Sequence, residues 1–230
     1  MRKNIIIVIS LIVVISVMSL VLVFMKTDEP KLNYTDDEIK FKDEYENLNG
    51  VELAQDYVLK TIDIESDNNI KYINDNEIMS KLTEGTNVIY FGWADCNWCR
   101  SIVPTLINTL KESEINTLYY YDFKKLRTEY ENNSDKDKTK IYENILNIIG
   151  EDITSVFSEE SPRSGEKKIL APTVVFIKDG KYITLHVKSV DSQINSTDEL
   201  TETQLKELKN IFQFKINQIK FNVCDSNEGC

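Results

Sequence analysis

The sequence predicts an α/β fold behind one N-terminal hydrophobic helix, and three observations support this prediction. Short apolar runs typical of buried strands alternate with segments whose apolar residues recur at helical spacing. The expected elements follow the order β-α-β-α-β-α-β-β-α, with no internal repeat. The 230 residues are 41% hydrophobic with only 7 Gly and 4 Pro, which suits one globular domain with appendages and excludes a disordered or fibrous protein.

The first 26 residues are expected to form a single membrane anchor. Residues 5–25 carry no charge, and a helix of this length spans about 30 Å, the thickness of the hydrocarbon core of a bilayer. Arg2 and Lys3 precede the run, so we expect the N-terminus in the cytoplasm and the rest of the chain outside the cell membrane. A cleaved signal peptide is the alternative, although no small-residue cleavage site follows the run.

The charge of the chain excludes one class of partner. Lys and Arg number 27 against 38 Asp and Glu, which gives a formal net charge of −11. Such a chain repels the phosphates of nucleic acids, so we expect no nucleic-acid binding.

Residues 27–69 are expected to form a juxtamembrane spacer and an N-terminal extension. Thr35 and Glu38 have the spacing of a capping box, which predicts a helix that ends near Gly50. A solvated acidic stalk is the alternative. Residues 57–64 are predicted to form a strand, which the turn-rich residues 66–69 end.

A domain over residues 70–220 accounts for the remaining elements, followed by a C-terminal tail at 221–230. A short helix is predicted from Asn74 to near Gly85. Strands are expected at 87–91, 115–123, 172–177 and 182–188, the last two joined by a hairpin turn. Helices are expected at 96–111, 139–149 and 199–219, the second of them inside a charged insertion at about 124–168.

Two cysteines separated by two residues lie where a buried strand is expected to end and a helix to begin. Cys96 would stand at the helix N-terminus, where free backbone N–H groups and the helix dipole stabilise a thiolate. Cys99, one turn further on the same face, is close enough to resolve a mixed disulfide. The carboxylate of Asp95 acts in the opposite direction, because a negative charge disfavours a thiolate.

Two segments carry a resemblance to a known family. Residues 91–104, which contain Trp93, Cys96, Cys99 and Pro104, resemble the active-site segment of thioredoxins, including the basic residue after the second Cys. Residues 171–180 resemble the cis-proline loop of the same family and the hairpin that follows it. The resemblance covers about residues 70–220. More narrowly, the chain is similar to membrane-anchored extracytoplasmic thioredoxin-like proteins of Gram-positive bacteria, including the bacteriocin transport accessory proteins.

The resemblance implies a thioredoxin fold, with helices on both sides of a central mixed sheet and, here, a helical insertion. It implies that Cys96 is the nucleophile and Cys99 the resolving thiol. Pro172 would be the cis-proline that packs against the disulfide, and the backbone of Ala171 would pair with an extended substrate peptide. Trp93 and Trp98 would shape the substrate surface.

The implied activity is thiol–disulfide exchange outside the cytoplasm. The partners would be thiols and disulfides of exported proteins, with a membrane redox partner as one source of electrons. No cofactor is expected, because the dithiol itself carries two electrons. Two departures from the family leave the direction of electron flow open: Tyr90 stands where thioredoxins have a buried Asp, and Asn97 and Trp98 replace their Gly-Pro.

Several alternatives stand beside this interpretation. A redox-inactive module that binds exported peptides would keep the fold without the exchange reaction. Cys224 and Cys230 are expected to form a local structural disulfide or a second redox pair. Another alternative is a tetrahedral zinc site, for which these two residues, Cys96 and Cys99 together supply four thiolates. His186, the only histidine, is predicted on the more polar face of its strand and not as a catalytic base.

Overall fold

The computed structural model of the protein describes residues 34–221, which belong to one compact unit. The predicted anchor at 5–25 and the pair Cys224 and Cys230 lie outside the described residues. Within residues 34–221, no helix has the length and apolar character needed to cross a bilayer.

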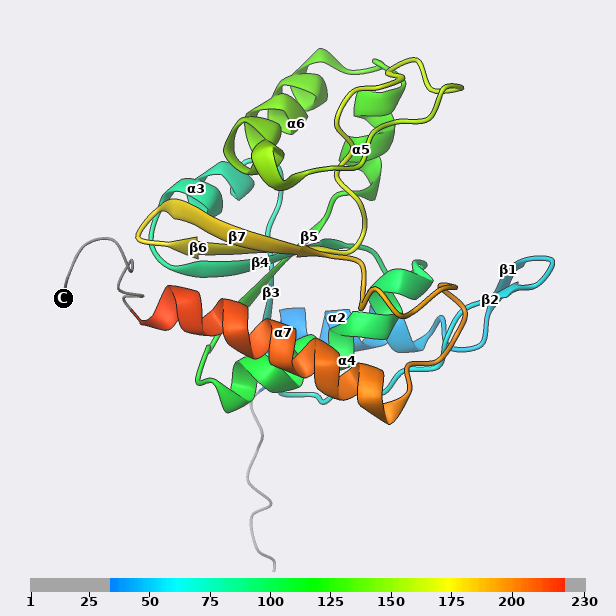
Figure 1. The fold of residues 1–230 in the computed structure, drawn as a ribbon, viewed down its shortest axis with the longest axis vertical. Helices are drawn as coiled ribbons and strands as arrows, with labels where there is room; N and C mark the ends of the chain where they lie inside the picture. Colours follow the sequence, from blue (N-terminus) through cyan, green and yellow to red (C-terminus); the bar gives the residue numbers. More distant parts are fainter. Residues whose placement is uncertain (1–33, 222–230) are drawn as a thin grey trace, which may run out of the picture. The chain divides into compact units, whose positions relative to one another are not determined.

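A five-stranded mixed sheet forms the centre of this unit (Figure 1). Its strand order is β3-β5-β4-β6-β7. β3, β5 and β4 run parallel to one another, whereas β6 is antiparallel to β4 and β7 is antiparallel to β6. The strands span Ile70–Tyr72 (β3), Asn87–Gly92 (β4), Leu118–Asp122 (β5), Thr173–Lys178 (β6) and Lys181–Val187 (β7). The α/β class and the mixed sheet are therefore confirmed.

Helices cover both faces of the sheet, as its buried central strands require (Figure 1). Three of them lie on one face: α2 (Asp36–Glu46), α4 (Asn97–Glu112) and α7 (Glu202–Lys220). The other face carries α3 (Ile78–Thr83), α5 (Lys124–Glu131) and α6 (Lys136–Ile149), with the short η1 (Gly150–Asp152) after α6. The long helices and β4 to β7 fall within a few residues of the predicted ranges, whereas the edge strand β3 is not among the predicted strands.

The N-terminal extension is part of the core. Helix α2 begins with the predicted capping box, in which Thr35 and Glu38 bond reciprocally to each other's backbone N–H groups. Phe41 and Tyr45 are fully buried, with ring centroids 4.9 and 6.3 Å from that of Tyr120 on β5. Burying two such side chains stabilises the fold by roughly 2 kcal/mol each, so this segment is a docked helix and not a solvated stalk.

The strand predicted at 57–64 is wrong for most of its length. Only Tyr57–Val58 (β2) pairs as a strand, in a small hairpin with Glu52–Ala54 (β1) that is separate from the main sheet. Residues 60–64 do alternate between buried and exposed positions. However, their N–H groups bond to side chains: Lys60 to Asn97, Ile62 to Asn49 and Ile64 to Glu46. These side-chain acceptors take the place of a neighbouring strand.

The insertion contains one more helix than the sequence predicts. Helix α5 occupies most of the highly charged residues 124–135, and it buries Leu126 and Tyr130. Tyr130 stacks on Tyr142 of α6 at a centroid distance of 4.0 Å. This contact packs the two helices of the insertion against each other.

Candidate redox site

Cys96 and Cys99 lie at the start of α4, as predicted. Cys96 is the N-cap residue, and its sulfur accepts a hydrogen bond of 3.3 Å from the backbone N–H of Cys99. Both cysteines are buried as free thiols; Cys96 is 8% exposed and Cys99 is 0% exposed. A thiol that caps a helix is the geometry that favours a thiolate at this position.

The two thiols have opposite pKa shifts. The pKa of Cys96 lies below its usual value, chiefly because the Cys99 thiol donates a hydrogen bond to it; backbone N–H groups and the charge of Arg127 act in the same direction against burial. The pKa of Cys99 lies well above its usual value, chiefly because burial disfavours its charged form. The site therefore holds one thiol prepared for attack and one held as a neutral thiol.

The loop before β6 faces this pair. The peptide bond between Ala171 and Pro172 is cis, as the resemblance implies. The thiol of Cys96 donates to the carbonyl oxygen of Ala171 at 3.6 Å, so the backbone of this loop contacts the first cysteine directly. The carbonyl of Pro172 accepts a hydrogen bond of 2.9 Å from the N–H of Lys188, which ties the loop to the end of β7.

The two tryptophans differ in their surroundings. Trp93 is only 8% exposed, and its ring packs against Phe123 at 5.2 Å and beneath the guanidinium of Arg127 at 4.3 Å. Trp98 is partly exposed, with the ammonium of Lys188 5.6 Å from its ring centroid. Trp98 is thus available at the surface, whereas Trp93 lies mostly under another side chain.

Asp95 is neutralised by a partner from the insertion. Its carboxylate forms an ion pair with Lys124, the first residue of α5. This pairing offsets the negative charge that would otherwise disfavour a thiolate on the adjacent Cys96.

Asn97, in the middle of the Cys-x-x-Cys segment, fastens the N-terminal extension to α4. It is fully buried; its amide donates to the carbonyl of Val58 at 2.8 Å and accepts from the N–H of Lys60 at 2.8 Å. The sequence marks Asn97 only as a departure from Gly-Pro, and the structure gives it a positioning role.

Arg100, the basic residue after the second cysteine, is 1% exposed and has no carboxylate partner within the described residues. Its guanidinium donates to the carbonyls of Lys60, Tyr45 and Ala94 and to the side chain of Asn49. Burial lowers its pKa, yet arginine stays charged at any physiological pH. A buried, hydrogen-bonded cation therefore lies one residue from the resolving thiol.

A pair of buried tyrosine hydroxyls reaches the other side of Cys99. The hydroxyls of Tyr90 on β4 and Tyr45 on α2 are 2.8 Å apart, and both side chains are 0% exposed. A hydrogen bond from Tyr90 lowers the pKa of Cys99, opposing part of the effect of burial. The pKa of Tyr90 itself is raised well above its usual value by burial, so this hydroxyl donates a hydrogen bond and does not take up a proton.

Gly92 makes room for this arrangement. A Cβ atom built at Gly92 would lie 2.2 Å from the Tyr90 hydroxyl oxygen. Only glycine leaves the space that the tyrosine ring occupies at this point of β4. The identity of Tyr90 is visible in the sequence, but the involvement of Tyr45 and Gly92 follows from tertiary contacts.

His186 does not belong to the site. Instead of lying at a solvated polar face, it packs edge-on against Phe212 of α7, with ring centroids 5.2 Å apart. Burial lowers its pKa to about 4, so it is neutral near pH 7. This location agrees with a structural role and with the prediction that it is not a catalytic base.

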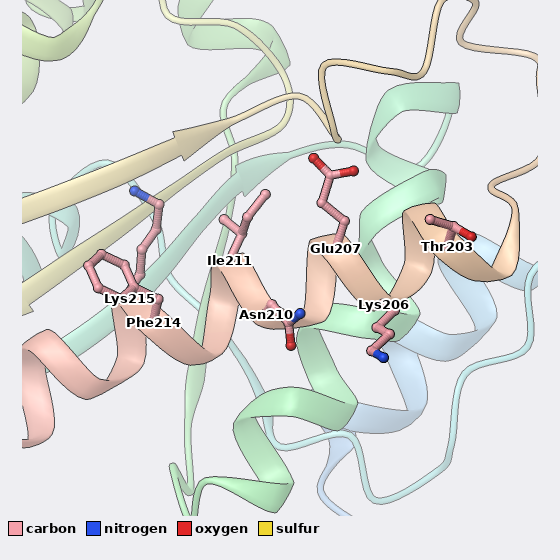
Figure 2. A pocket seen from close by; sticks show the side chains of 7 residues that line it. All are labelled: Thr203, Lys206, Glu207, Asn210, Ile211, Phe214 and Lys215. Atoms are coloured by element: carbon pink, nitrogen blue, oxygen red, sulfur yellow. The ribbon is translucent and has the colours of Figure 1, made fainter.

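A shallow hollow on α7 holds no comparable chemistry. It is lined by side chains between Thr203 and Lys215, all from this one helix, including the exposed Phe214 (Figure 2). No thiol lines it, and it is separate from the dithiol.

The described residues also hold no cluster of three or more potential metal-ligating side chains. The four-thiolate alternative requires Cys224 and Cys230, which lie beyond residue 221. In comparisons with known proteins, no protein-family model matches the chain and no curated protein is significantly similar to it.

Proposed function

We propose that this chain is a thioredoxin-like thiol–disulfide oxidoreductase that acts on exported proteins outside the cytoplasm from an N-terminal membrane anchor. The observation that carries the proposal is the asymmetric dithiol: Cys96 caps α4 with a lowered pKa, and Cys99 is buried behind it with a raised one. Inert structural cysteines need no such difference.

The reductive direction proceeds in two exchanges. The thiolate of Cys96 attacks one sulfur of a substrate disulfide; a Cys96–substrate bond forms, and the other substrate sulfur leaves as a thiolate that takes a proton from solvent. Cys99 then loses its proton and attacks the sulfur of Cys96, which forms the Cys96–Cys99 disulfide and releases the second substrate thiol. Two electrons pass from the dithiol to the substrate. The oxidative direction is the reverse.

The surrounding residues have separate roles in this reaction. The N–H of Cys99 stabilises the attacking thiolate through its bond to the sulfur of Cys96. When Tyr45 donates to Tyr90, the hydroxyl proton of Tyr90 is free to bond the sulfur of Cys99. This hydrogen bond stabilises the negative charge that Cys99 carries when it attacks Cys96. Tyr90 takes the position of the family's carboxylate but acts as a donor, so the proton of Cys99 leaves to the substrate thiolate or to water.

Trapping the mixed disulfide tests the proposal. In a background with Cys224 and Cys230 changed to Ser, Cys99→Ser should accumulate a covalent complex with a disulfide-containing protein, visible on a non-reducing gel. The matched variant Cys96→Ser should form none, although it keeps one cysteine. Equal trapping by both variants, or by neither, would contradict the proposed roles.

The equilibrium reduction potential of the pair decides the direction. A value near −270 mV would indicate a reductase that needs a membrane electron donor, and one near −120 mV an oxidant. A protein that does not exchange with glutathione at any poise would favour the redox-inactive peptide-binding module. Stoichiometric zinc in the purified full chain would favour the thiolate metal site.

A further inference from the structure

Two cations lie on the two tryptophans that flank Cys96 in the sequence. The guanidinium carbon of Arg127, on α5, is 4.3 Å from the ring centroid of Trp93. The ammonium of Lys188 is 5.6 Å from the ring centroid of Trp98. Lys188 is exposed and Arg127 is partly exposed, and partial burial lowers the pKa of the Arg127 guanidinium.

Contacts of the neighbouring chain place both cations beside the dithiol. The N–H of Lys188 bonds to the carbonyl of Pro172, in the same loop that contacts the sulfur of Cys96. Arg127 lies one helical turn beyond Lys124, whose ion pair with Asp95 docks the start of α5 next to the first cysteine. Two separate elements therefore bring a positive charge to the same site.

Neither cation forms an ion pair with a carboxylate within the part of the chain that the structure describes, although the charge of Glu131 on α5 acts on Arg127 at longer range. No ion pair within 4.0 Å and no side-chain hydrogen bond satisfies Arg127 or Lys188 between residues 34 and 221, whereas the neighbouring Asp95 is already paired. This is an unusual arrangement in a chain with a formal net charge of −11, because carboxylates are abundant elsewhere on its surface.

We propose that Arg127 and Lys188 select substrates whose redox-active cysteine is flanked by carboxylates, that is, acidic disulfide-bonded peptide segments. This inference rests on the proposed function. The N–H groups of a guanidinium lie in one plane and form a fixed fork, from which a carboxylate accepts two hydrogen bonds. Lys188 offers a second, less directional charge. Both act as specificity residues and not as catalytic residues, because the exchange itself involves only sulfur atoms of Cys96, Cys99 and the substrate.

Three peptides test the selection. They share one intramolecular disulfide and differ only in having Glu, Gln or Lys on both sides of each cysteine. The full chain, reduced and freed of reductant, is itself the electron donor in a single turnover. We expect it to reduce the Glu peptide about tenfold faster than the Lys peptide, with the Gln peptide between them. Raising the salt to about 0.5 M should shrink this preference, since it screens exposed charges.

Variants assign the preference to the two cations. Arg127→Gln and Lys188→Gln should each reduce the Glu-to-Lys rate ratio several-fold, and together they should bring it close to 1. The ratio is used because loss of Arg127 also changes the reactivity of Cys96 with every peptide. Lys125→Gln, a change on the same helix at an exposed residue paired with Glu129, is the matched control and should leave the ratio unchanged. A wild-type ratio near 1, or one that survives in the double variant, would overturn the inference.

A binding measurement separates this inference from the proposed function. Versions of the peptides with Ser in place of both cysteines cannot exchange, and their binding is followed by the fluorescence of Trp93 and Trp98. Reduction of all three peptides at equal rates would refute the selection and leave the oxidoreductase standing. Preferential binding of the acidic Ser peptide without reduction of any disulfide would refute the oxidoreductase and keep an acidic-peptide site. Equal binding and no reduction would refute both.

Discussion

Replacing Tyr90 by Phe removes one hydroxyl from a buried pair and should destabilise the protein more than replacing Tyr45 does. In Tyr90→Phe the hydroxyl of Tyr45 loses its hydrogen-bond partner while it stays 0% exposed. An unsatisfied buried hydroxyl costs about 1–3 kcal/mol, so we expect the free energy of unfolding to fall by about 2 kcal/mol. In Tyr45→Phe the hydroxyl of Tyr90 keeps the Cys99 thiol as a partner, and about 1 kcal/mol is expected.

The double variant tests whether the two hydroxyls act as a pair. With both removed, no unpaired hydroxyl remains, and the loss should be about 1–1.5 kcal/mol instead of the sum of about 3 kcal/mol. Urea unfolding of the four reduced proteins, followed by tryptophan fluorescence, measures each free energy of unfolding and hence the coupling. Additive losses, within about 0.5 kcal/mol, would refute the description of these hydroxyls as mutual partners.

Three further predictions concern space, pH and charge around the sheet and the dithiol. Gly92→Ala places a methyl group 2.2 Å from the hydroxyl oxygen of Tyr90 and should lower the free energy of unfolding, measured by chemical unfolding, by about 2 kcal/mol or more. In the control Gly150→Ala, the new methyl group lies 3.7 Å from its nearest neighbour, a side-chain atom of Leu146, and the change should be less than about 1 kcal/mol. Burial lowers the pKa of His186 from 6.5 to about 4, so between these pH values the unfolded chain binds a proton that the folded chain does not. The free energy of unfolding should therefore fall by up to about 3 kcal/mol as the pH falls through this window. Unfolding curves of His186→Gln taken from pH 7 to pH 4 should lack this dependence. Lys124→Gln frees the carboxylate beside the dithiol and should raise the pKa of Cys96, measured as the pH dependence of iodoacetamide alkylation; an unchanged or lower pKa would contradict the neutralising role of Lys124.

The sequence predicts the features of the site that are local along the chain. A buried strand followed by an amphipathic helix places Cys96 at the N-cap without any tertiary information, because the change of hydrophobic period marks the boundary. The capping box at Thr35 and Glu38 is equally local, and it forms as predicted. The order of β4 to β7 along the chain follows for the same reason, whereas the short edge strand β3 is not predicted.

The features that the sequence does not predict depend on partners far apart in the chain. Nothing near Tyr45 indicates that its hydroxyl lies 2.8 Å from that of a tyrosine 45 residues later. Residues 57–64 are predicted as a strand, but whether the N–H groups of Lys60 and Ile62 meet a strand or the side chains of Asn97 and Asn49 depends on the packing of α2 and α4. The charged composition of residues 124–135 hides a helix with only two buried side chains.

The contacts of Arg100 have a consequence for where the functional unit of this chain begins. Its guanidinium bonds to the carbonyl of Tyr45 and the side chain of Asn49, both of which precede residue 70. A chain cut at residue 70 would keep every strand of the central sheet and both cysteines. It would, however, remove these two hydrogen-bond acceptors from the buried guanidinium next to the resolving thiol. A version of this site built into another protein must therefore include α2 and the residues that follow it, because they supply acceptors for Arg100 that the sheet does not.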